Sequence, residues 1–168
     1  VLLLNSITGK FETKPWQEFR DEALWTTEVD VLLKANLDVL QKVHDQLFPR
    51  SGHQGDGLRA CLDLVVRRTK LGMTEKVVQF CFAMSKMTVK DEVNNHAEYE
   101  RLRFPEFLEF LGRVAHARFA ESVEAPLEQT LPAVLDAVLG AHGLKRADVE
   151  DTDLDGLSSD ESLADFDA

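Results

Sequence analysis

Apolar residues recur at helical spacing in five separate segments of this chain, with glycine, proline or polar residues between them. A period of about 3.6 residues is typical of amphipathic helices, whereas half-buried strands alternate strictly between apolar and polar residues. No segment shows a sustained alternation, so we predict an all-α fold. The expected helical ranges are 16–48, 58–71, 74–87, 104–115 and 126–139.

Residues that favour helix ends lie next to several of these ranges. Thr26 or Thr27 is expected to cap a helix start, and Thr74 to cap the third helix, because a threonine hydroxyl accepts a hydrogen bond from a free backbone N–H. Gly140 or Gly143 is expected to end the last helix, because glycine adopts the left-handed conformation without strain.

The order of the helices predicts two helix-loop-helix units in tandem, followed by an extra C-terminal helix and an acidic tail. Paired hairpins of this kind bury both apolar faces together. We therefore divide the chain into an N-terminal extension (1–24), a helical domain (25–146) and a tail (147–168) that is disordered or bound by a partner.

The negative charge is concentrated at the C-terminus. The formal net charge is −11, and residues 148–168 hold nine acidic residues and no basic ones. The remaining residues are close to neutral and lack the concentrated basic face that phosphate binding requires, so we expect no nucleic-acid partner.

Cysteine usage and hydropathy indicate a reducing, cytoplasmic compartment. Cys61 and Cys81 lie in apolar helical patterns and are expected to be buried free thiols rather than a disulfide. No apolar run approaches the about 18 residues of a membrane-spanning helix, so we expect no membrane partner.

The segment from Leu102 to Leu111 resembles the second half of an EF-hand calcium loop and its exit helix, as in the calmodulin superfamily. Leu102 corresponds to the apolar loop residue, Phe104 to a packing residue of the exit helix, and Glu106 to the final, bidentate ligand. The resemblance implies that the helix-loop-helix units are an EF-hand-like pair.

The other calcium ligands of this loop are missing. An EF-hand loop requires oxygen ligands at positions 1, 3, 5 and 12 and glycine at position 6. Counting back from Glu106, positions 1, 3, 5 and 6 hold Asn95, Ala97, Tyr99 and Glu100. We therefore predict that Glu106 is a capping or surface acid and that this loop binds no calcium.

A second partial match lies in the acidic tail. Asp151, Asp153 and Asp155 copy the first half of a calcium loop, but Ser158 and Ser162 take the later apolar and ligand positions. A solvated tail is the simpler interpretation. We predict no metal site; if calcium did bind, its ligands would come from these three aspartates or from Glu106.

Nothing in the sequence indicates catalysis. The five histidines show no metal-binding spacing, and nucleophile motifs are absent. We expect neither an enzyme nor a cofactor.

Large apolar residues outside the main helical stripes suggest protein contacts. Phe82 and Phe110 fall off the stripes of their helices, and a second apolar face often packs against another protein. We predict interaction surfaces at these two residues and at Trp16 and Trp25.

A longer stretch of the chain resembles calmodulin-like helical proteins of ciliated and flagellated organisms. The resemblance rests on residues 25–30, 35–37, 80–89 and 102–115. It implies a structural or docking piece of the ciliary or flagellar axoneme with other axonemal subunits as partners. We therefore expect a calcium-independent structural and protein-interaction module, with a calcium-sensing regulator, using a nonconventional loop or the acidic tail, as the alternative.

Overall fold

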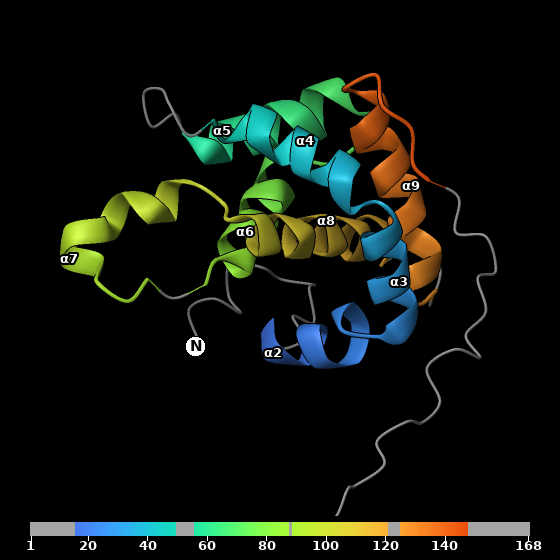
Figure 1. Cartoon of the computed structure of the whole chain (residues 1–168), viewed down its shortest axis with the longest axis horizontal. Helices are drawn as coiled ribbons and strands as arrows, with labels where there is room; N and C mark the ends of the chain where they lie inside the picture. The colour runs from blue at the N-terminus through green and yellow to red at the C-terminus, as the bar shows by residue number, and fades with distance from the viewer. Residues whose placement is uncertain (1–15, 50–55, 88, 121–124, 148–168) are drawn as a thin grey trace, which may run out of the picture.

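Helix α8 (Phe104–Phe119) runs through the centre of the molecule, and the other long helices pack around it (Figure 1). The computed structural model describes residues 16–49, 56–87, 89–120 and 125–147. Helices α9 (Leu127–Gly140) and α6 (Glu75–Ser85) make the most extensive contacts with α8, and α4 (Leu37–Leu47) also packs on it.

All regular elements of the described residues are helical, which confirms the predicted all-α fold. No helix in these residues is both long and apolar enough to cross a membrane. The remaining elements are α2 (Trp16–Phe19), the π-helical turn η1 (Arg20–Leu24), α3 (Thr27–Ala35), α5 (Gly57–Leu62), the π-helical turn η2 (Asp63–Arg68), α7 (Glu92–Asn95) and the 3₁₀ turn η3 (His96–Glu100).

Three of the expected helix ends are present. The hydroxyls of Thr26 and Thr74 accept hydrogen bonds from the backbone N–H groups of Val29 and Val77, each at 3.4 Å. Helix α9 ends at Gly140, and Gly143 follows with a φ of 69°, as expected for a glycine that reverses the chain after a helix.

The range 16–48, predicted as helical with a helix start at Thr26 or Thr27, is interrupted before Thr27 and again at Asn36, where α3 passes into α4. Asn36 is buried, and its side-chain Nδ2 donates to the carbonyl oxygen of Leu32 at 2.9 Å. Its Oδ1 accepts from the backbone N–H of Ala147 at 2.8 Å. An asparagine that bonds to backbone groups competes with helix continuation. The same side chain therefore ends α3 and holds the last described residue against the helical body.

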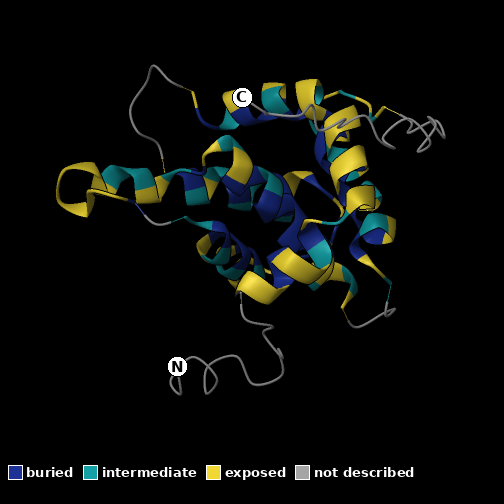
Figure 2. Ribbon diagram, turned by 60° about the horizontal axis from the view of Figure 1, so that its bottom comes forward, coloured by how far each residue is buried: buried dark blue, intermediate teal, exposed yellow. Residues whose placement is uncertain are grey.

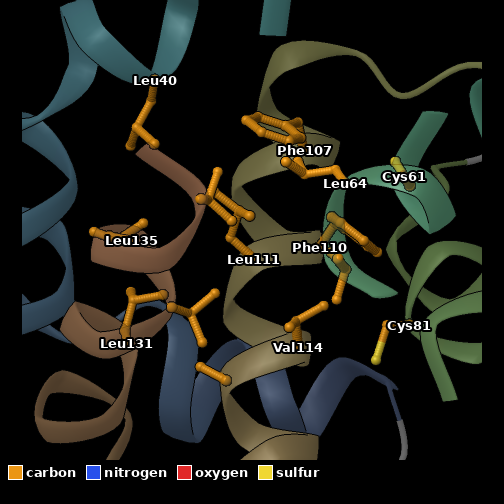
Figure 3. Packing of buried hydrophobic residues seen from close by; sticks show 14 of the residues in the cluster. Leu40, Cys61, Leu64, Cys81, Phe107, Phe110, Leu111, Val114, Leu131 and Leu135 are labelled. Atoms are coloured by element: carbon orange, nitrogen blue, oxygen red, sulfur yellow. The ribbon is translucent and has the colours of Figure 1, made fainter. Parts of the chain in front are cut away.

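The core extends on both sides of α8. Figure 3 shows α8 side chains between residues of α9 on one side and residues of α5, η2 and α6 on the other. The labelled members are Phe107, Phe110, Leu111 and Val114 of α8, Leu131 and Leu135 of α9, Cys61, Leu64 and Cys81, and Leu40 of α4.

The two cysteines are buried and free, which confirms their predicted state. Burial raises the pKa of the Cys81 thiol to about 12. Burial also raises the pKa of the Cys61 thiol far above its ordinary value.

The structure corrects the predicted role of Phe82 and Phe110. Both side chains are buried, Phe82 at 6% and Phe110 at 0% relative exposure, so neither forms a free docking face. Phe110 lies on a helix that is covered on two sides, and a central helix requires apolar residues on more than one face. On α6 the buried positions are Val78, Cys81, Phe82 and Ser85, so Phe82 belongs to the buried face of its helix.

The predicted N-terminal extension also needs correction, because its described part belongs to the core. Phe19 and Leu24 are 2% and 6% exposed and join the same apolar cluster as α8 and α9. Leu24 and Phe19 lie near Gly112 of α8, where a Cβ would meet Leu24 Cδ1 at 2.9 Å. The folded unit therefore includes residues 16–24.

One part of the chain projects from this body. Helix α7 and η3 form an arm that extends away from α6 and α8 (Figure 1), and Figure 2 shows that its surface is mostly exposed or intermediate. Val93 in α7 is 88% exposed, whereas Leu102 at the base of the arm is fully buried. The base of the arm is thus fixed in the core and its tip is open to solvent.

Candidate functional site

Glu106, predicted to be a capping or surface acid, lies in the first turn of α8 and is 1% exposed, so it caps the helix and is not a surface acid. Its Oε2 accepts from the backbone N–H of Arg103 at 2.6 Å and from Lys86 Nζ at 2.8 Å. Its Oε1 accepts from the backbone N–H of Met87 at 2.7 Å. The carboxylate therefore caps α8 and joins it to the end of α6 through charge-assisted hydrogen bonds.

Lys86 follows the last residue of α6 and reaches across the base of the arm. Its Nζ donates to the backbone carbonyls of Glu98 at 2.9 Å and Arg101 at 2.6 Å, in addition to Glu106. The Lys86 side chain is 9% exposed. A lysine side chain with so little exposure is tolerated because its charge is paired and each of its N–H groups has an acceptor.

His44 of α4 holds the next carbonyl of the same segment. Its Nε2 lies 3.0 Å from the carbonyl oxygen of Leu102, and its ring packs among the aromatic rings of Phe48, Phe104 and Phe107. A carbonyl can only accept, so Nε2 carries the proton in this contact. The histidine thereby fixes the chain just before α8 begins.

The start of α5 approaches the segment before α8 at Gly57. A Cβ at this position would collide with the carbonyl oxygen of Glu100, and it would lie 3.0 Å from the Cα of Arg101 and 2.9 Å from Phe48 Cε1. Glycine is required here because backbone, rather than a flexible side chain, occupies the space. The start of α5 and the segment before α8 therefore lie side by side.

The arrangement around Glu106 uses its carboxylate for protein contacts. A calcium loop needs six to eight oxygen ligands, and a bidentate glutamate must offer both oxygens. Here both oxygens already accept from Lys86, Met87 and Arg103. Among the residues that the structure describes, no three His, Cys, Asp or Glu side chains are grouped so that they could hold a metal ion. Asp151, Asp153 and Asp155 lie outside the described residues.

A second buried charge cluster joins the N-terminal segment to α8. Glu109 accepts from Arg20 Nε at 2.7 Å and from Arg113 Nε at 2.8 Å, and all three residues are buried. The Arg113 guanidinium lies 4.5 Å from the centre of the Phe19 ring. Desolvation lowers the pKa of Arg113 below its ordinary value, and Glu109 opposes that shift.

Of the four predicted interaction residues, Trp25 is the one that the structure places at the surface. Its side chain is 62% exposed, although it is a large aromatic. Phe82 and Phe110 are core residues, and the side chain of Trp16 lies outside the described part of the chain. The other large apolar side chains that are exposed in the described residues are those of Val31, Leu37, Val93 and Tyr99.

Comparison of the chain with protein-family models, curated proteins and solved structures gives no match. The fold itself defines the chain as an all-helical protein.

Sequence reasoning found Glu106 but missed Lys86 and His44, which surround the same segment. Lys86 is 20 residues from Glu106, and His44 is 58 residues from Leu102, so no local pattern links them. Glu109 and Arg113 are four residues apart on α8, and this helical spacing is a readable signal for an ion pair.

Proposed function

We propose that this chain is a calcium-independent structural and protein-interaction module built on an EF-hand-like helix pair. One observation carries the proposal: both oxygens of the carboxylate at the final ligand position are used by donors of the protein itself. A loop closed in this way has one conformation whether calcium is present or not. A module of this kind presents a constant surface, whereas sensor EF-hands open a groove when calcium binds.

The contact at Gly57 supports the paired arrangement. Paired loops lie side by side, and here the start of α5 meets the backbone of Glu100 and Arg101. Helix α6 packs on α8, and α4 packs on both α5 and α8, as expected for two helix-loop-helix units that share one core.

Trp25 is the residue that we propose to contact a partner protein. Tryptophan is enriched among the residues that dominate interface energetics, and truncation of such a residue costs about 2 kcal/mol or more. A loss of 2 kcal/mol corresponds to about thirtyfold weaker binding. The partners that the family resemblance implies are axonemal subunits, so the location that we propose is a cilium or flagellum.

Co-sedimentation with demembranated axonemes tests this function. We expect the chain to bind with the same affinity in calcium and in a calcium chelator, and Trp25→Ser to bind about thirtyfold more weakly. Val93→Ser is a matched control, since it removes an exposed apolar side chain from the arm. Equal binding of the wild type and Trp25→Ser would exclude Trp25 as the contact, and no binding would count against an axonemal partner.

Calorimetry with calcium separates the proposed function from a calcium sensor. We expect no binding below millimolar calcium by the full chain. Binding by the wild type but not by a variant with Asp151, Asp153 and Asp155 changed to Asn would assign a sensor site to the tail. Binding by both proteins would show that another part of the chain coordinates calcium.

A further inference from the structure

The ammonium group of Lys86 lies within a shell of three oxygen atoms. Two are backbone carbonyls, those of Glu98 at 2.9 Å and Arg101 at 2.6 Å, and the third is Oε2 of Glu106 at 2.8 Å. An ammonium group has three N–H donors and no acceptor, so each donor has one partner. Both ionic side chains are shielded from water, at 9% and 1% exposure.

These are the oxygen types that bind a hard metal cation in a calcium loop. With Glu106 at position 12, Arg101 is at position 7, where an EF-hand loop supplies a backbone carbonyl to the ion. The ammonium thus takes two of the ligand atoms that the metal would take. This register rests on the proposed function, whereas the three contacts are independent of it.

We propose that the Lys86 ammonium is a covalently attached cation that replaces the metal ion of this loop, and that the loop accepts a free primary ammonium ion when this side chain is removed. A tethered cation has a high, fixed effective concentration, so the loop remains closed at any calcium concentration. A degenerate loop thereby retains a defined structure without its ion.

The same contacts close the base of the arm. Lys86 lies where the arm leaves α6, and Glu98, Arg101 and Glu106 lie where it returns to α8. The ammonium therefore joins the two ends of the segment that carries α7. Loss of these contacts would release the arm before the α8–α9 core is disturbed. Of the four residues that make the contacts, only Glu106 belongs to α8 or α9.

The geometry selects an ammonium ion over calcium. Three oxygens satisfy the three N–H groups of a primary ammonium, whereas calcium requires six to eight oxygens at about 2.3–2.6 Å. Two further acceptor positions of Glu106 are occupied by the N–H groups of Met87 and Arg103. The space that Lys86→Ala leaves therefore matches propylammonium, whose three carbons and nitrogen correspond to the lysine side-chain atoms beyond Cβ.

Thermal unfolding of the full chain tests the proposal. Lys86→Ala leaves the Glu106 carboxylate without its ion-pair partner, and we expect the melting temperature to fall by on the order of 10 °C. Propylammonium chloride is expected to recover part of this loss with a saturating dependence on concentration, as for a ligand that binds only the folded state. Tetramethylammonium chloride at equal ionic strength has no N–H donor and should give no such recovery.

Lys34→Ala is the matched control. Lys34 is a surface lysine, 72% exposed, that pairs with Asp30, and its loss should change the melting temperature little and leave no site for propylammonium. The proposal is overturned if propylammonium raises the melting temperature of Lys86→Ala no more than that of Lys34→Ala. Stabilisation by calcium but not by propylammonium also overturns it.

A measurement on the wild type covers the case in which Lys86→Ala does not fold. Burial and three hydrogen bonds slow the exchange of ammonium protons with water, so Lys86 should give a resolved ammonium ¹⁵N–¹H signal at neutral pH, correlated with its own Cε. Absence of this signal overturns the proposal. If the wild type instead binds calcium, the proposed function is wrong. The proposal about Lys86 is then decided separately, by whether propylammonium stabilises Lys86→Ala.

Discussion

The buried carboxylate of Glu109 holds the N-terminal segment against α8, and Glu109→Gln tests how much this clasp contributes. Glu109 accepts from Arg20 Nε at 2.7 Å and from Arg113 Nε at 2.8 Å, with only 2% of the residue exposed. A glutamine keeps the shape but has one oxygen, so its NH₂ group must face one of the two guanidinium groups, donor against donor. The substitution also removes the negative charge between two positive ones.

Breaking a buried ion pair by removing one partner costs about 3–5 kcal/mol, and we expect Glu109→Gln to lose stability in this range. This is a large fraction of the about 5–15 kcal/mol that stabilises a typical domain. Urea unfolding followed by circular dichroism measures the loss as a lower midpoint with an unchanged slope. Hydrogen exchange should show that the amides of residues 20–24 lose protection before those of α8.

Glu75→Gln is the matched control for this experiment. Glu75 is 58% exposed at its side chain and lies 3.9 Å from Arg67, so its loss should cost less than about 1 kcal/mol. If Glu109→Gln costs no more than the control and the amides of residues 20–24 keep their protection, the clasp is unimportant and our account of residues 16–24 is refuted.

Two further predictions concern packing and the thiols. Gly57→Ala places a Cβ against the backbone of Glu100 and should lower the free energy of unfolding in urea by about 1–3 kcal/mol. Gly140→Ala is the control and should not destabilise the protein, because nothing lies within 4 Å of the added Cβ. Equal effects of the two substitutions would contradict the close approach at Gly57. The pKa of Cys81 is raised to about 12 and that of Cys61 is also raised, so both thiols stay protonated in the folded state. Because the unfolded thiols ionise near a pKa of about 8.5, stability should be full below that pH and fall as pH rises above it, by up to about 1.4 kcal/mol per pH unit for each thiol. Urea unfolding between pH 7 and 10 measures this slope, and reaction of both thiols with a thiol reagent in the native state at pH 8 would contradict the burial.

The helices of the fold could be predicted from the sequence because their signals are local. The apolar period located α6, α8 and α9, and threonine hydroxyls marked the starts of α3 and α6. The break at Asn36 could not be predicted in the same way, since one of its two bonds joins residues 111 positions apart. The period also could not distinguish a docking face from a second core face, which is why Phe82 and Phe110 were assigned to the surface.

The candidate site shows the same limit. Glu106 was found because the residues around it in sequence carry a recognisable pattern. Lys86, which pairs with Glu106, was not found, because a lysine after an apolar helix has no distinguishing neighbour in the sequence. The three acceptors of Lys86 lie 12 to 20 residues further along the chain. The Arg20–Glu109 pair spans 89 residues and is likewise a product of the tertiary fold.

The bond between Asn36 and Ala147 has a mechanical consequence. The chain after α9 is fastened by its backbone to the α3–α4 junction, at 2.8 Å from the Asn36 amide oxygen. A force applied to the residues after Ala147 therefore acts first on the α3–α4 junction and not on the last turn of α9. This contact protects α9 from unfolding from its C-terminal end. Any load that a bound protein applies through the acidic segment would enter the domain beside α3.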